Sequence, residues 1–189
     1  MGIYKVFKNF KKFIIFLILF LFVIFLLSRG VIYRKSELSY GVTFSHKQAI
    51  DRALDWKKAY ASILDELGVK KIRLSAYWDE IEGSEGNYKW EYLDWQLAEA
   101  KKRNVEVVLA LGGRLPRWPE CHFPDWAKII PKEEKDQALL EYIEKTVERY
   151  KDKEIIKYWQ LENEPFLPNF GECPVLDKEF LDQEQALQK

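Results

Sequence analysis

The stretch that decides the fold is an apolar run that ends in acidic residues, Tyr158-Trp159-Gln160-Leu161-Glu162-Asn163-Glu164-Pro165. The apolar, β-rich character extends back to Ile155. Buried strands of a parallel sheet have near-continuous apolar sequences of this kind. The stretch therefore predicts a strand over 155–161 whose C-terminal end presents carboxylates.

Three similar runs precede it, at Tyr40–Phe44, Lys71–Trp78 and Val105–Leu111. A helical pattern follows each of the three, and Asp177–Lys189 has the composition of a fourth helix. Alternation of strands and helices is typical of a parallel α/β sheet. The order is therefore β-α repeated four times.

The three helices are predicted from apolar residues spaced three or four apart, with a stop or start signal beside each. Gly68 and Asn104 are stop signals for the first two helices, and Pro131 lies near the first turn of the third. The apolar faces are Trp56, Tyr60, Ile63 and Leu67; Leu93, Leu97 and Ala100; and Leu139, Ile143, Val147 and Tyr150.

Long segments follow the C-terminal ends of the strands. The segment Gly112–Ile130 links the third strand to its helix, although ordinary βα loops have about 2–6 residues. In α/β barrels the site is built from these loops. The loop lengths therefore place function at the strand C-termini.

Charge separates the chain into two parts. The first 35 residues hold seven basic residues and no acid, and residues 36–189 hold 23 basic and 30 acidic residues. An acidic domain argues against a nucleic-acid partner, which requires a basic patch. All seven Trp lie in this acidic part, where they suit stacking on sugars or, equally, the core.

Phe13–Leu27 is an unbroken apolar run of 15 residues. A helix of this length covers about 22 Å, short of a bilayer core of about 30 Å. Because lysines precede the run, the positive-inside rule puts the N-terminus in the cytoplasm. An uncleaved anchor is favoured over a signal peptide, since no small-residue cleavage site follows. We expect a cytoplasmic basic tail (1–12), a transmembrane anchor (13–27), a linker (28–38) and an extracytoplasmic domain (39–189) of a single-pass membrane protein.

The exit of the fourth strand resembles that of the clan A glycoside hydrolases, which include the family 5 cellulases and mannanases and the family 42 β-galactosidases. In that clan an Asn-Glu pair, often followed by Pro, ends the fourth barrel strand. The resemblance implies that Glu164 is the general acid/base and that Asn163 contacts the sugar 2-hydroxyl.

Three further motifs agree in order. Val69–Leu74, followed by Trp78, is similar to the second strand of the clan, and Arg73 matches the Arg that lies beside the nucleophile. Gly86–Trp90 resembles the start of the second helix, and Gly112–Pro119 resembles a substrate-side loop. The resemblance covers roughly residues 40–170. It implies an α/β fold, a (β/α)8 TIM barrel, of which the chain holds about the first four βα units.

The implied reaction is retaining hydrolysis of a β-linked poly- or oligosaccharide, which needs two carboxyl groups. The proton donor requires a raised pKa, to which the flanking Trp159 and Phe166 could contribute. The clan's nucleophile ends the seventh strand, which these 189 residues do not hold. We therefore expect residues 36–189 alone to be inactive, and aggregated or oligomeric. The alternative is a non-catalytic, membrane-anchored remnant that binds glycan.

Several residues at or after strand ends are candidate sugar contacts, although each suits loop packing equally well. They are His46, Trp78, Arg114, Trp118, His122 and Trp126. Acidic residues of the same loops, such as Asp79, Glu80 and Glu82, are expected to be solvated.

Cys121 and Cys173 fall in the loops after the third and fourth strands. Export permits oxidation, so two states stay open: a disulfide across the active-site rim, or two free thiols. The two His and two Cys lack the spacing of a zinc site, and no glycine-rich phosphate loop is present. The sequence therefore predicts no metal and no cofactor.

Overall fold

The computed structural model describes residues 2–32, 40–168, 170–171 and 173–187. It contains two compact units, residues 1–39 and residues 40–189. The first unit is the helix α1 (Gly2–Ile32), along which the side chains of 13–27 are exposed. None of the described helices reaches the length and apolar character needed to cross a membrane. Most of the expected linker, 33–38, lies outside the described residues.

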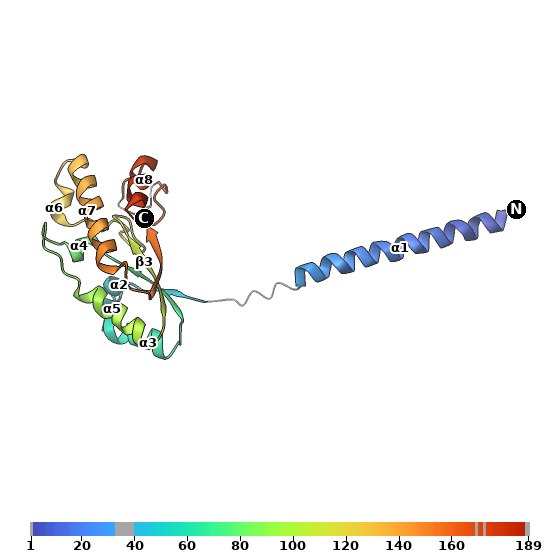
Figure 1. Cartoon of the computed structure of the whole chain (residues 1–189), viewed down its shortest axis with the longest axis horizontal. Helices are drawn as coiled ribbons and strands as arrows, with labels where there is room; N and C mark the ends of the chain where they lie inside the picture. Colours follow the sequence, from blue (N-terminus) through green and yellow to red (C-terminus); the bar gives the residue numbers. More distant parts are fainter. Residues whose placement is uncertain (1, 33–39, 169, 172, 188–189) are drawn as a thin grey trace. The chain divides into compact units, whose positions relative to one another are not determined.

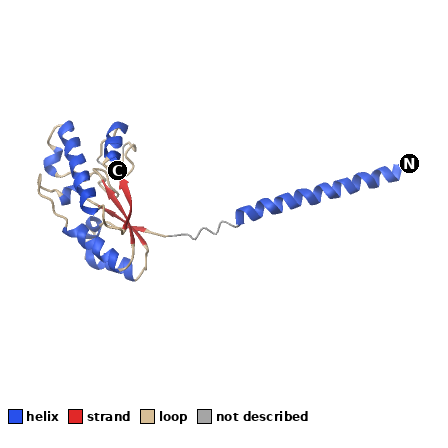
Figure 2. Ribbon diagram, viewed as in Figure 1, coloured by secondary structure: helices blue, strands red, loops and turns tan. Residues whose placement is uncertain are grey.

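The second unit is built on a parallel sheet of four strands, coloured red in Figure 2. The strands occur in chain order: β1 (Val42–Thr43), β2 (Lys71–Ser75), β3 (Glu106–Leu111) and β4 (Ile156–Leu161). Because each strand pairs in parallel with the next, all four C-terminal ends lie at one edge of the sheet. The loops predicted to carry function therefore share that edge.

Three long helices connect or cover the strands, as Figure 1 shows: α3 (Trp56–Asp65), α5 (Glu91–Lys102) and α7 (Lys132–Tyr150). A fourth, α8 (Lys178–Ala186), packs against α7 and β4. Asp55 and Asp177 cap α3 and α8, since their carboxylates accept the backbone N–H groups left unpaired at the first turn. Shorter helices lie in the loops after strands: α2 (His46–Asp51), α4 (Trp78–Ile81) and α6 (Asp125–Lys128).

One apolar core fills the space between the sheet and its helices. Alternate strand residues such as Ile72, Leu74 and Leu109 point into this core. They meet Tyr60 of α3 and Tyr142 of α7, both fully buried. The helical faces predicted from sequence therefore pack where amphipathic helices of an α/β protein should pack.

The predicted elements are present, with shifted ends. The run Lys71–Trp78 was predicted as strand throughout, but β2 ends at Ser75 and Trp78 begins α4. The first run shortens to Val42–Thr43. Gly68 and Asn104 have positive φ angles of 60° and 53°, as residues that end helices commonly do. The fourth helix begins at Lys178, directly after the capping Asp177.

Candidate functional site

The sheet has a second face, opposite the helical core, and its polar residues line up across strands. Thr43, Arg73, Val108 and Tyr158 occupy one row of paired positions. Ser75, Ala110 and Gln160 form the next row toward the strand C-termini. In a closed barrel, a face of this kind points to the interior.

Arg73 connects three strands across this face. Its Nε donates to Thr43 Oγ1 at 3.0 Å, and its Nη1 donates to Gln160 Oε1 at 3.0 Å. Burial lowers the pKa of the Arg73 guanidinium, and the nearby positive Arg117 lowers it further. The nearby Glu164 raises the pKa of Arg73 and so opposes these two effects. The matched arginine and the matched acid/base glutamate therefore belong to one electrostatic cluster.

Glu164 lies directly after β4 and is exposed to solvent. Phe166, expected to help enclose it, is exposed as well. The apolar enclosure that a proton donor needs is therefore not formed by its sequence neighbours. Asn163, half-buried beside it, is held by its backbone N–H, which donates to the Arg114 carbonyl at 2.7 Å.

Arg114, predicted from sequence as a sugar contact, is only 1% exposed. Its guanidinium instead holds the loop after β4, since Nη1 donates to the Leu167 carbonyl at 3.0 Å and Nη2 to the Phe170 carbonyl at 2.9 Å. Its Nε lies 3.7 Å from Glu120 Oε2. Arg114 therefore joins the loops after β3 and β4.

Among the described residues of these two loops, four other than glycine have positive φ angles: Arg117 at 95°, Glu120 at 71°, Glu162 at 54° and Glu164 at 52°. Such conformations cost about 1–3 kcal/mol each and cluster at functional sites. Their concentration here is independent of any sequence motif. It marks the same edge of the sheet as the candidate site.

The two histidines lie in a separate polar cluster behind this edge. His46 pairs with Glu80 and its ring lies 4.2 Å from that of Tyr92. His122 Nδ1 accepts a hydrogen bond from Lys47 Nζ, 3.2 Å away. Burial lowers the pKa of His122 to about 4. Both rings are buried, and their contact with a sugar stays a prediction.

The tryptophans divide between core and surface. Trp78 is fully buried, and its Nε1 donates to Glu82 Oε2 at 2.8 Å. Its contact with a sugar stays a prediction, whereas Glu82, expected to be solvated, is buried with it. Half-buried Trp126 packs edge-on against Trp78. By contrast, Trp118 is 66% exposed in the loop after β3 and remains a candidate for stacking on a sugar.

A disulfide joins Cys121 to Cys173, 52 residues apart in sequence, and so links the loops after β3 and β4. Among the residues that the structure describes, no group of three or more His, Cys, Asp or Glu is arranged to hold a metal ion.

We predict that no thiol titrates in the denatured, unreduced chain, because both cysteines are consumed by this bond. Reduction should lower stability by about 2–4 kcal/mol, chiefly by freeing the unfolded chain. Thiol counting and thermal unfolding with and without reductant measure the two effects. Two titratable thiols before reduction would contradict the bond.

Sequence reasoning missed three neighbours of Arg73, namely Gln160, Arg117 and Glu120. The position of Gln160 could have been predicted, because Gln160 lies two residues beyond Tyr158 and therefore shares its face of the strand. Arg117 and Glu120 were not, since both lie in an irregular loop whose path no periodicity predicts.

Comparisons with known proteins agree with this geometry. The sequence profile of glycosyl hydrolase family 10 matches residues 33–178. The β-galactosidase BgaA of Clostridium cellulovorans is 29% identical over 132 residues, which cover 60% of this chain and 20% of that protein. This chain therefore spans about a fifth of the length of that relative.

Solved structures show the same fold. A GH5_18 protein of Streptomyces cattleya in complex with GlcNAc has a TM-score of 0.59 and 16% identity, over 79% of this chain and 41% of that one. The exo-β-1,4-mannosidase Op5Man5 of an Opitutaceae bacterium has a TM-score of 0.60 and 13% identity, over 80% and 29%. The α/β fold expected from sequence, with four parallel strands of a barrel-like sheet, is confirmed.

Proposed function

The chain belongs to glycosyl hydrolase family 10, and on that premise we propose that it serves hydrolysis of β-linked poly- or oligosaccharides, with Glu164 as the acid/base carboxyl group. The resemblance to clan A is confirmed, although the matching profile is that of family 10 and the sequence motifs suggested family 5 or 42. The observation that carries the proposal is the position of Glu164. It follows β4 at the edge where Arg73 and Asn163 also lie.

In this proposal Glu164 protonates the leaving oxygen and a second carboxylate attacks the anomeric carbon. Retaining enzymes hold the two carboxyl groups about 5–5.5 Å apart. Glu120 does not fit the second role, because it is buried and lies against Arg114 and Asn163. We therefore place the nucleophile outside the four described strands; the resemblance to clan A implies that it ends the seventh strand of the barrel.

Three features support a carbohydrate as the substrate. Trp118 presents an exposed ring, Asn163 offers a side-chain amide beside Glu164, and Arg73 supplies positive charge on the inner face. Flat aromatic rings and a few convergent polar groups are what sugar sites require. The names of the relatives suggest β-galactosides and β-mannosides as first substrates for trial.

The experiment is a panel of fluorogenic aryl β-glycosides, offered to the full chain alone and to the full chain mixed with a separately expressed second half of a family 10 barrel. Release of the fluorophore in either preparation, with retention at the anomeric centre by NMR, supports the proposal. Hydrolysis with inversion contradicts the retaining mechanism. Absence of turnover in both preparations, with saturable binding of oligosaccharide, favours a non-catalytic glycan-binding protein.

The binding alternative rests on one specific observation. Glu164 is exposed, and the described residues close to it provide no free second carboxylate, whereas the exposed Trp118 provides a stacking surface without any catalytic partner. A binding constant that is unchanged in the Glu164→Gln variant but weakened in the Trp118→Ala variant would support it.

We further propose that residues 13–27 hold the chain in a membrane, with residues 1–12 in the cytoplasm and residues 40–189 outside. The proposal is supported by the exposed apolar side chains of this segment and by the lysines that precede it. Because the run is short, the bilayer must thin locally or Lys12 must extend toward the headgroups. Protease added outside intact cells should digest residues 40–189, and a mature N-terminus near residue 30 would rule out the anchor.

A further inference from the structure

Glu162 is a buried acid at the end of β4 that the proposed mechanism does not use. It is 2% exposed, although it lies two residues before the exposed Glu164. Its backbone N–H still continues the sheet, donating to the Leu111 carbonyl at 3.0 Å. Its side chain turns toward the loop after β3. A carboxyl group in such a place requires strong partners, because burial of a charge is costly.

The partners are two backbone amides. Gly113 N–H donates to Glu162 Oε1 at 2.7 Å, and Arg114 N–H donates to Oε2 at 2.5 Å. The loop is shaped closely around this carboxyl group. Gly112 has a φ of 128°, and a Cβ added there would lie 2.3 Å from Glu162 Oε1. Only glycine therefore allows the loop to approach the carboxylate this closely.

Arg114 transmits this contact to the candidate site. Its N–H is held by Glu162, and its carbonyl accepts the N–H of Asn163 at 2.7 Å. Its guanidinium holds the carbonyls of Leu167 and Phe170. Arg114 thus holds the segment that carries Glu164 through Asn163, Leu167 and Phe170. The backbone of Arg114 is in turn held by Glu162.

A second buried acid completes the arrangement. Glu184 of α8 has no exposed surface, and neither of its side-chain oxygens has a hydrogen-bond partner among the described groups. Burial and the adjacent Glu162 raise the pKa of Glu184. Burial also raises the pKa of Glu162, although the two amide N–H donors lower it. Two carboxylates cannot both be charged in such a place, so the pair retains a proton.

We propose that Glu162 is a positioning residue, which holds Asn163 and Glu164 at the end of β4 as a carboxylate that shares one proton with Glu184. The protonated Glu184 donates to Glu162, which accepts this proton and the two amide N–H groups. The role assigned to Asn163 and Glu164 rests on the proposed function, whereas the shared proton and the held loop do not. The same contact fastens α8 to the edge of the sheet that carries the site.

The other charged groups that face the pair are few. Arg114, on the loop after β3, lowers the pKa of Glu162, and Asp136 of α7 raises that of Glu184. Asp136 is itself paired with Lys132. Because folding raises both pKa values, the contribution to stability is complete at acidic pH. It is lost as the pH rises from the ordinary glutamate pKa, about 4.3, through the raised pKa values of the folded pair.

The test follows the backbone amides of Gly113, Arg114, Asn163 and Glu164 by NMR in the full chain, from below the ordinary glutamate pKa to about pH 10. In the unaltered chain all four resonances should move together with one midpoint well above the ordinary glutamate range. In Glu184→Gln the amide group replaces the shared proton as donor, so this common transition should disappear while the four resonances stay near their original positions. The fall of the unfolding temperature with rising pH should flatten in the same variant.

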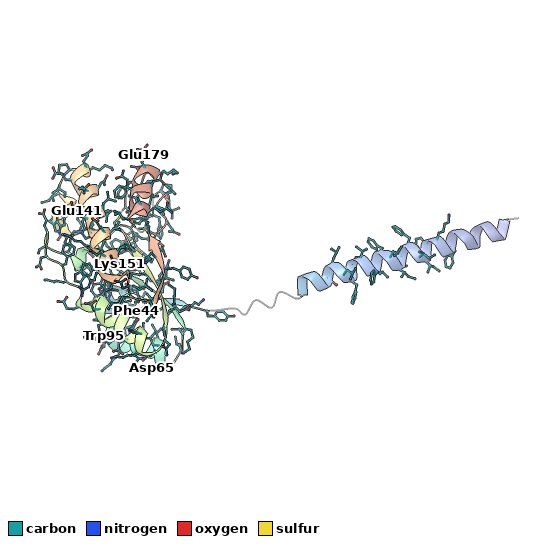
Figure 3. The ribbon with its side chains drawn as sticks, in the orientation of Figure 1. Phe44, Asp65, Trp95, Glu141, Lys151 and Glu179 are labelled. Atoms are coloured by element: carbon teal, nitrogen blue, oxygen red, sulfur yellow. A yellow bond between two sulfur atoms is a disulfide. The ribbon has the colours of Figure 1, made fainter. Side chains whose placement is uncertain are left out.

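Glu162→Gln should shift the Gly113 and Arg114 resonances toward those of weaker hydrogen bonds, since a neutral oxygen accepts less strongly than a carboxylate. The matched control is Glu179→Gln, an exposed glutamate that Figure 3 labels on α8, which should keep the wild-type transition. A transition at the ordinary glutamate pKa, or one that survives in Glu184→Gln, would overturn the shared proton. Movement of Gly113 and Arg114 without Asn163 and Glu164 would overturn the positioning role. None of these measurements requires turnover, so a failed glycosidase assay leaves them interpretable.

Discussion

Replacing Glu164 with glutamine is expected to lower kcat/KM on alkyl β-glycosides by about 10²–10⁴-fold, the usual contribution of a positioned general acid. The change preserves size and hydrogen-bonding groups but removes the proton that the leaving oxygen needs. Aryl β-glycosides with acidic phenols should lose far less in the bond-breaking step, because their leaving groups depart without protonation. Initial rates on matched alkyl and aryl substrates, in the preparation that hydrolyses the substrate panel, measure the difference.

Glu154→Gln is the matched control for this prediction. Glu154 is an exposed glutamate at the opposite end of β4, so its replacement changes charge equally but lies away from the strand C-termini. It should leave both rates within about twofold, since isolated surface substitutions rarely change stability by more than about 0.5 kcal/mol. Full retention of alkyl glycoside hydrolysis in Glu164→Gln would remove Glu164 from the role of acid.

Replacing Trp78 with alanine is expected to destabilise the fold by about 3–5 kcal/mol, the usual cost of truncating a buried tryptophan. Trp78 is fully buried among Phe123, Trp126 and Tyr142, whose rings lie 5.6 to 5.8 Å from its own. Its removal leaves a cavity and an unpaired Glu82 oxygen. Denaturant unfolding followed by circular dichroism measures the loss.

Trp118→Ala serves as the comparison for Trp78, because it removes the same side chain from an exposed position. It should change stability by less than about 1 kcal/mol and should instead weaken binding of oligosaccharide. If Trp78→Ala kept wild-type stability and lost only sugar binding, the placement of Trp78 in the core would be contradicted.

The sequence was sufficient for the βα order because that order rests on long apolar runs and helical spacing, which report burial directly. It was insufficient where an apolar run continues from a strand into a short helix. Trp78 continues the apolar run of β2, but it begins α4 and packs beneath the loop after β3. No periodicity distinguishes a strand residue from the first residue of a short helix, so α2, α4 and α6 were not predicted.

At the site, resemblance located the exit of β4, but not the environment of its side chains. Glu164 is exposed, although a proton donor requires apolar surroundings, while Glu162, two residues before it, is buried. The difference in exposure arises from the backbone conformation. Both residues have positive φ angles, so the alternation of side chains in a regular strand no longer applies to them. The partners of Arg114 could not be predicted either, because they are carbonyl groups of a loop 53 and more residues away.

The strand order of the sheet also bears on how the protein is made. Each strand pairs only with its predecessor and successor in the chain, so the spatial order is the order of synthesis. As the chain leaves the ribosome N-terminus first, each new βα unit can pair with the strand that was made just before it, without waiting for a distant segment to insert. Pairing of neighbours also keeps sequence separation moderate for a parallel sheet, which favours rapid assembly. The protein is thus suited to folding cotranslationally, one unit at a time.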